Sequence, residues 1–180
     1  MEKYSILEKE INLIQDMAIK EWTKATLNNA PDYFYKAWAS STGKYHPQCT
    51  CKEGGLIIHV KRAVYIANRL CTGWGIENID RDIVLTAVIL HDIAKTGVNT
   101  GTKEDYINHP INAEKYFTGE VCIDKLQIDI INECIRHHMG LWTPEKIRKP
   151  LESYIPHELI VYMADYMAAT KDLITPVDNE

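Results

Sequence analysis

Five segments of the chain carry histidine or aspartate residues that could bind a metal ion. They are His59, the pair His91-Asp92, His109, the pair His137-His138, and Asp165. The intervals between them run from 17 to 32 residues, and each interval covers about one helix and one loop. A helical bundle can bring such positions together inside its core.

The sequence around three of these segments is apolar, which predicts burial. Residues 83–90 are apolar on every side of a helix that leads directly into His91-Asp92. Asp165 lies within the apolar segment 159–167, and His59 lies between Ile58 and Val60. A lone buried histidine is more often a satisfied core residue than a ligand. Several together favour a site, because buried polar groups must be paired or bound to metal.

The residue types favour a transition metal. Neutral imidazoles with two carboxylates suit Fe, Mn, Zn, Ni or Co better than Mg or Ca, which prefer oxygen ligands. One ion could be held by four residues: His59, His91, Asp92 and Asp165. A second could take His109 and His137, with His138 as a further candidate and Asp92 bridging both ions. We therefore expect two divalent ions, with iron or manganese as the first choice.

The elements that must position these residues are predicted to be helices, and no alternating strand pattern is found. An apolar stripe from Leu7 through Ile14 and Trp22 to Ala25 predicts one long helix that ends near Pro31. Further helices are expected over 56–70, 80–95, 110–119, 124–138 and 156–171, with a shorter aromatic one over 33–38. The fold class is thus an all-α bundle of about six or seven helices. Residues 1–30 form an N-terminal helix that packs on, or extends from, a domain over 31–175.

Charge and hydropathy limit the partners. The formal net charge is −5 and the pI is near 5.8, which argues against an extended surface that binds duplex nucleic acid. No apolar run reaches the length of a membrane span, and the charged start does not resemble a secretory signal. We expect a cytoplasmic protein with no membrane partner, and the sequence gives no prediction of its oligomeric state.

The five cysteines are expected to be free thiols. Their odd number and the absence of a signal sequence argue against a disulfide framework. Cys49 and Cys51 follow His46 and could hold zinc, but no second ligand pair follows at zinc-finger spacing.

The ordered histidines and aspartates resemble those of the HD superfamily of metal-dependent phosphohydrolases. The resemblance rests on His59, on residues 90–95 (Leu-His-Asp-Ile-Ala-Lys) and on Ala164-Asp165, and it covers about residues 34–172. His109 and the pair His137-His138 resemble the additional histidines of the family's binuclear members. The resemblance implies an HD-domain helical bundle over 31–175.

Two further likenesses narrow the expected class of HD enzyme. Residues 34–41, 44–46 and 54–59 are similar to the HD domains of bacterial exoribonucleases, although the separate oligonucleotide-binding module of those enzymes is missing. Ala164-Asp165-Tyr166 resembles stand-alone HD hydrolases that split dinucleoside tetraphosphates. The Gly-Tyr-Pro signature of cyclic-dinucleotide phosphodiesterases does not follow His138.

Substrate contacts are predicted at Lys95, Tyr45, His46 and Trp142. Lys95 lies four residues after His91, on the same face of a helix, so its ammonium could hold a phosphate beside the metals. It matches the family's His-Asp-x-x-Lys pattern, and we expect it to act with Asp92 in catalysis. Structural packing is an equal alternative for Tyr45, His46 and Trp142. The basic cluster Lys146, Arg148 and Lys149 could attract an anion, although a solvated loop is the simpler reading.

The predicted function is hydrolysis of a phosphate ester of a nucleotide or short oligonucleotide by a metal-activated water. Phosphoryl transfer needs positioning and charge stabilisation rather than a protein nucleophile. Two alternatives stay open. The same ligand set suits the mixed-valent di-iron oxygenases of this fold, which act on small organic substrates. Alternatively, the metals could stabilise the fold of a non-catalytic interaction module.

Overall fold

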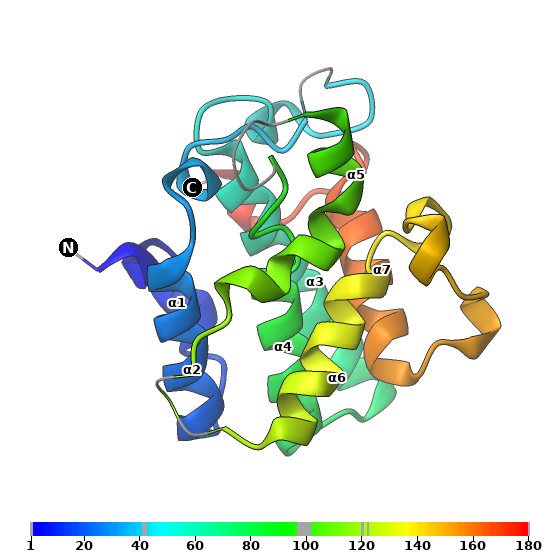
Figure 1. The fold of residues 1–180 in the computed structure, drawn as a ribbon. Helices are drawn as coiled ribbons and strands as arrows, with labels where there is room; N and C mark the ends of the chain where they lie inside the picture. The colour runs from blue at the N-terminus through cyan, green and yellow to red at the C-terminus, as the bar shows by residue number, and fades with distance from the viewer. Residues whose placement is uncertain (1, 41–42, 97–101, 120, 122, 180) are drawn as a thin grey trace.

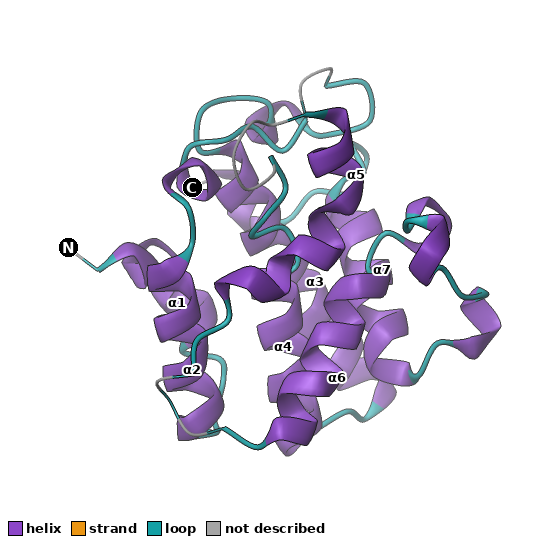
Figure 2. Ribbon diagram, in the orientation of Figure 1, coloured by secondary structure: helices purple, strands orange, loops and turns teal. Residues whose placement is uncertain are grey.

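The protein is described by a computed structural model, which covers residues 2–40, 43–96, 102–119, 121 and 123–179. Every regular element in this part of the chain is helical, which confirms the predicted all-α bundle (Figure 2). The α-helices are α1 (Glu8–Ile11), α2 (Met17–Asn29), α3 (Gly55–Trp74), α4 (Asn78–Leu90), α5 (Lys103–Asn112), α6 (Lys125–His137) and α7 (Pro156–Ala168). Short 3-10 turns are η1 (Lys3–Leu7), η2 (Asp32–Tyr35), η3 (Gln48–Thr50), η4 (Ala113–Tyr116), η5 (Gly140–Trp142), η6 (Glu145–Ile147), η7 (Leu151–Ser153) and η8 (Pro176–Asn179).

Helix α4 is the centre of the bundle. It packs against α2, α3, α6 and α7, and Figure 1 shows α2 and α6 on opposite sides of it. Every residue from Ile83 to Leu90 is buried, as the apolar sequence predicted. Burying one such aliphatic side chain stabilises a fold by about 1.5–3 kcal/mol, so α4 fixes the positions of the helices around it.

The prediction of one long N-terminal helix is wrong. The chain forms η1 and α1, leaves the helical conformation over residues 12–16, and restarts as α2. Within α2, Ile19 and Trp22 are buried, whereas Ala18 is exposed.

Two aspartates produce this break. The Asp16 carboxylate accepts a hydrogen bond from the Ile19 amide at 2.9 Å and so caps α2. Asp82 of α4 is 1% exposed, and its Oδ2 accepts from the amides of Gln15 (2.9 Å) and Asp16 (2.7 Å). A buried carboxylate from a distant helix thus binds the amides at the start of α2, which apolar periodicity alone does not reveal.

The predicted helix over 110–119 is also misplaced. Helix α5 begins at Lys103, after a capping box between Thr102 and Asp105, and Pro110 lies inside it. The residues after Pro110 continue only as far as η4. The first half of α5 lacks an apolar stripe, so periodicity missed it, although the capping box was visible in the sequence.

The other helices lie close to their predicted places. Asp124 caps α6 and Pro156 is the first residue of α7, at the predicted starts of these helices. Helix α3 runs a few residues beyond its predicted end, to a cap at Gly75 with φ +67°. Helices α4 and α7 end earlier than predicted, at Leu90 and Ala168. Neither α4 nor any other helix in the described residues combines the length and apolarity that crossing a bilayer requires.

Replacing Asp82 with alanine should lower the free energy of unfolding by about 2–4 kcal/mol, because two amides lose a charged acceptor. Urea unfolding monitored by circular dichroism measures the change. Asp129→Ala is the matched control, since that carboxylate is 55% exposed and pairs with exposed Lys125. It should cost less than about 0.5 kcal/mol. Equal losses in the two variants would contradict the role assigned to Asp82.

Candidate metal centre

The first predicted ligand, His59, is placed by a tight loop at the start of α3. A side chain on Gly55 would have its Cβ 2.1 Å from the carbonyl oxygen of Thr50, so only glycine permits this approach. The amides of Gly54 and Leu56 donate to the carbonyls of Lys36 and Ala37. This arrangement buries His59 and brings His46 of the loop to a ring-centroid distance of 5.8 Å from it.

Three histidines present the same ring nitrogen to a common space. Nδ1 of His91, His109 and His138 lies 2.6–2.7 Å from the carbonyl oxygen three residues earlier. A carbonyl only accepts, so each Nδ1 carries a proton and each Nε2 is directed toward the common space. In α5 the accepting carbonyl is that of Tyr106, four residues before Pro110, which has no amide hydrogen to offer it.

A first group of donor atoms comes from α3, α7 and the turn after α4. Nε2 of His59 lies 2.9 Å from Oδ1 of Asp165 and 3.3 Å from Nε2 of His91. Oδ2 of Asp92 lies 3.7 Å from His59 and 3.4 Å from His91. The structure therefore brings together the four residues that the sequence predicted as one set.

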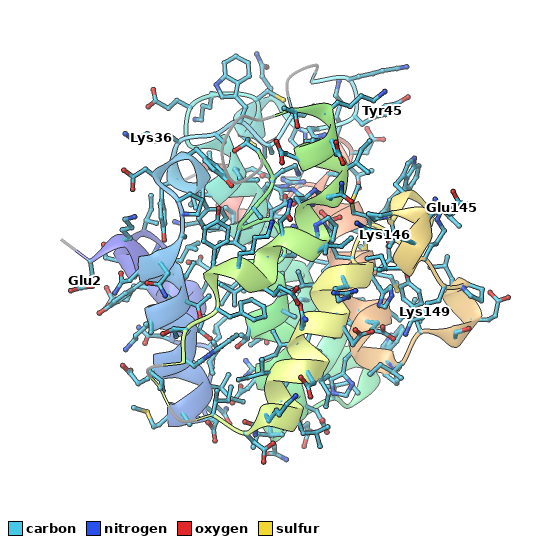
Figure 3. All side chains as sticks on the ribbon, viewed as in Figure 1. Glu2, Lys36, Tyr45, Glu145, Lys146 and Lys149 are labelled. Carbon is cyan, nitrogen blue, oxygen red and sulfur yellow. The ribbon has the colours of Figure 1, made fainter. Side chains whose placement is uncertain are left out.

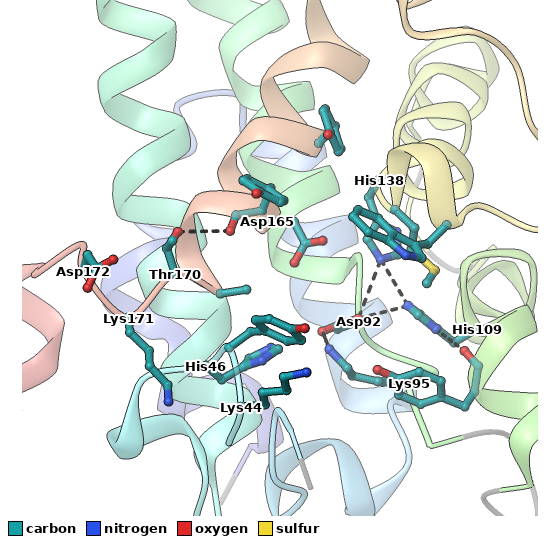
Figure 4. Close-up of a pocket in the computed structure, with 17 residues that line it drawn as sticks. Lys44, His46, Asp92, Lys95, His109, His138, Asp165, Thr170, Lys171 and Asp172 are labelled. Atoms are coloured by element: carbon teal, nitrogen blue, oxygen red, sulfur yellow. Dashed lines mark hydrogen bonds and ion pairs between the residues drawn. The ribbon is translucent and has the colours of Figure 1, made fainter. Parts of the chain in front are cut away.

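A second group lies on the other oxygen of Asp92. Nε2 of His109 is 3.1 Å from Oδ1 of Asp92 and 3.1 Å from Nε2 of His138. The distance from His138 to the same oxygen is 3.7 Å. Asp92 thus faces one group with each carboxylate oxygen, and Figure 4 shows it between His109, His138 and Lys95.

These spacings fit a metal ion in each group. Bonds of about 2.0–2.2 Å to nitrogen or oxygen place neighbouring ligands about 3–3.5 Å apart. Oδ1 of Asp92 is buried and has no hydrogen-bond donor among the described residues. Lone pairs that face one another across about 3 Å repel unless a positive charge lies between them. The donor set therefore suits the binding of divalent metal.

The electrostatics keep most of the donors in the form that binds metal. Burial raises the pKa of Asp92 and Asp165, but Lys95 and histidines beside Asp92, and histidines beside Asp165, outweigh it and hold both values well below the usual range. Burial and the neighbouring imidazoles lower the pKa of His138 to about 3. Burial also opposes a charge on His91, yet Asp92 and Asp165 raise its pKa to about 10. The carboxylates thus favour a positive charge at His91.

The structure does not bring His137 to this cluster, although the sequence assigned it to the second ion. Its Nδ1 lies 2.9 Å from Oε1 of Glu158, and its Nε2 lies 2.9 Å from the carbonyl oxygen of Ile147. Lys149 also binds Glu158, at 2.6 Å. Both ring nitrogens of His137 are therefore engaged elsewhere, and His138 holds the position beside His109. On a helix, adjacent residues point in different directions, so only one of the pair can face the cluster.

Lys95 lies at the cluster, but it is carried by a turn and not by the continuous helix that was predicted. Residues 91–96 form successive turns rather than a continuation of α4. The Lys95 ammonium consequently meets Asp92, three residues earlier, with Nζ 2.6 Å from Oδ2. Lys95 is 7% exposed, and this ion pair keeps its ammonium next to both donor groups.

A cavity of about 670 Å³ opens onto the cluster. Its wall includes the predicted substrate residues Tyr45, His46, Lys95 and Trp142, together with metal-ligand candidates. Tyr45 is 67% exposed and Trp142 is 63% exposed, so both rings are available at the rim. His46 is half-buried, and burial lowers its pKa to about 4, which leaves a neutral ring beside His59.

Sequence reasoning missed several residues of the cavity wall. They are Lys44, Tyr106, Met139, Tyr162, Tyr166, Thr170, Lys171 and Asp172. Two of them had a usable signal, because Tyr106 and Tyr162 lie three residues before His109 and Asp165. That spacing puts a ring on the same helix face as the ligand. The segment after α7 carried no such signal.

The remaining predicted features lie away from the cavity. Lys146, Arg148 and Lys149 lie on the loop between α6 and α7, and Figure 3 shows Lys146 and Lys149 on this projecting part of the molecule. None of the three lines the cavity. Cys49, Cys51, Cys71 and Cys134 are free thiols, as expected, and Cys122 lies outside the described residues.

Comparison with known proteins agrees with this geometry. The family model of the HD domain matches residues 56–170, a range that contains both donor groups. A search of curated proteins and a search of solved structures found no match. HD domains are typically metal-dependent hydrolases. Because this match covers more than half of the chain, the protein belongs to the HD domain family.

Proposed function

We propose that the protein is a metal-dependent phosphohydrolase that hydrolyses a phosphate ester of a nucleotide or short oligonucleotide. The observation that carries the proposal is the bridging position of Asp92, with histidines on each oxygen and the Lys95 ammonium on the same carboxylate. His59, His91, Asp92 and Asp165 would hold one ion, and Asp92, His109 and His138 would hold a second. Bound there, iron or manganese would supply a Lewis acid and a water of lowered pKa.

The chain's own residues supply the remaining requirements of phosphoryl transfer. Lys95 is buried and cationic beside Asp92, so it can bind a phosphoryl oxygen and stabilise negative charge. The carbonyl bonds to Nδ1 of His91, His109 and His138 fix those rings before the substrate arrives. No protein nucleophile is needed, because positioning and charge account for most of this reaction.

The cavity supports a nucleotide as the substrate class. Five aromatic side chains line it: Tyr45, Tyr106, Trp142, Tyr162 and Tyr166. Such rings stack on bases of any sequence. Lys44 and Lys95 contribute cationic groups, and Figure 4 shows both inside the cavity near Asp92. The volume suits a ligand of nucleotide size.

The di-iron oxygenase uses the same kinds of ligand, and direct measurement separates the two enzymes. Consumption of O₂ with an organic substrate by the iron-loaded protein, without release of phosphate from any nucleotide, would replace the proposal. A non-catalytic module whose fold is stabilised by metal would show neither activity, and would unfold when its metal is removed.

Removing one histidine should change the number of bound ions. The intact protein, purified from metal-supplemented medium, should hold about two ions per chain, and His138→Ala about one, because the second group loses a ligand. Elemental analysis by mass spectrometry measures both. His137→Gln is the matched control: it changes the adjacent histidine, which faces Glu158, and should keep two ions. Loss of an ion in His137→Gln alone would contradict the assignment.

Activity should depend on Asp92 and Lys95. A panel of nucleotides and short oligonucleotides is assayed for phosphate or nucleoside release with Mn²⁺ or Fe²⁺. Asp92→Ala should abolish turnover because both donor groups lose the shared carboxylate. Lys95→Met should lower it about 10²-fold, the usual effect of removing one charge-stabilising group. Lys125→Met, whose lysine is 86% exposed, should have no effect. A metal-loaded protein that leaves the whole panel intact would refute the phosphohydrolase proposal.

A further inference from the structure

Arg62 is a fully buried arginine on α3, one helical turn after His59. Its guanidinium donates to three carbonyl oxygens: Ala168 (3.0 Å), Thr170 (3.2 Å) and Leu173 (2.8 Å). It also forms an ion pair with Asp178. All four acceptors lie on the segment that begins at the last residue of α7.

These bonds complete the C-terminal end of α7. The last carbonyls of a helix have no partner within it and need donors from elsewhere. Arg62 supplies one to Ala168, the final helical residue, and two more to the turn that follows. A buried arginine can do this because its planar fork carries five donors in fixed directions.

The same turn of α7 carries the ligand candidate Asp165. It lies three residues before Ala168, and its backbone carbonyl accepts from the Ala169 amide at 3.1 Å. Helices α3 and α7 therefore meet in two successive contacts, His59 with Asp165 and Arg62 with Ala168. The contact between Arg62 and Ala168 fixes how far α7 is shifted along its axis relative to α3. The contact between His59 and Asp165 depends on that shift.

The segment that Arg62 holds also forms part of the cavity wall. Ala169, Thr170, Lys171 and Asp172 line the cavity, and Figure 4 shows Thr170 and Asp172 along this wall, on the same side as Asp165. Arg62 itself lies behind the wall and is not a lining residue.

We propose that Arg62 is a positioning residue of the metal centre: by binding the end of α7 it holds Asp165 where it can share an ion with His59 and His91. This inference rests on the proposed function, because it assumes that the first donor group binds metal. Among the described residues, the bonds of Arg62 go to the backbone after α7 and to Asp178, not to the donor atoms. Its effect passes through the backbone of α7.

A purely structural arginine would affect stability alone, and the chain offers one for comparison. Arg81, also on a helix, donates to the carbonyl of Leu13 at 2.8 Å and to Asn68. It ties the N-terminal segment to α4 and does not line the cavity. Arg62→Lys and Arg81→Lys both keep the charge and lose the fork, so the pair separates general stability from metal positioning.

The experiment is a titration of the full-length, metal-free proteins with Co²⁺, whose visible absorption reports the ligand geometry. Thermal unfolding of the same samples measures stability. Arg62→Lys should weaken one of the two Co²⁺ equivalents about ten-fold and change its absorption bands. Arg81→Lys should bind both like the unaltered protein, even where the two variants lose similar stability. If Arg62→Lys fails to fold, Arg62→Gln replaces it, because the neutral amide leaves no unpaired buried charge and still lacks the fork that binds Ala168, Thr170 and Leu173.

The outcomes distinguish the two proposals. If the unaltered protein binds no Co²⁺, the proposed function fails and this inference fails with it. If the unaltered protein binds Co²⁺ and a folded Arg62→Lys or Arg62→Gln binds it with the same affinity and spectrum, only the positioning role is overturned. A matching loss in Arg81→Lys would likewise overturn it, because the effect would then be one of stability.

Discussion

The rest of the structure depends on one interaction: the close, buried contact of several imidazole nitrogens with the carboxylate of Asp92. Nε2 atoms of His109 and His138 lie within 3.1 Å of each other, and His91 and His59 approach to 3.3 Å. Such groups repel in a medium of low dielectric constant unless positive charge lies among them. Lys95 provides one charge, and the two donor groups have the geometry to bind more.

The fold keeps this unfavourable arrangement in place through its apolar core. Helix α4 is buried along residues 83–90 and ends at His91, so its packing determines where the His-Asp pair lies. Helices α3, α6 and α7 pack against α4 and bring their own histidine or aspartate to the same end. The burial of these helices offsets the cost of crowding polar groups.

Polar anchors set the finer positions at the edges of the core. Asp82 fixes the amides at the start of α2, and Arg62 fixes the carbonyls at the end of α7. Each is a buried charge on a core helix that binds backbone groups of a distant segment. Hydrogen bonds of this kind have direction, whereas apolar contact does not, so they determine where a helix begins or ends. The cavity wall depends on the bonds of Arg62 to the end of α7, because residues 169–172 of the wall follow directly after it.

The sequence by itself determined the helical class, the central apolar helix and four ligand candidates for the first donor group. Apolar periodicity and the cost of burying charge are local properties, and they are sufficient for these features. Only the tertiary structure decided between His137 and His138, because the phase of the helix directs His138 toward Asp92 and His137 toward Glu158. It also broke the N-terminal helix at residues 12–16 and brought Tyr162, Tyr166 and the segment after α7 to the cavity. Those outcomes depend on contacts between residues as much as 116 positions apart, which no local pattern records.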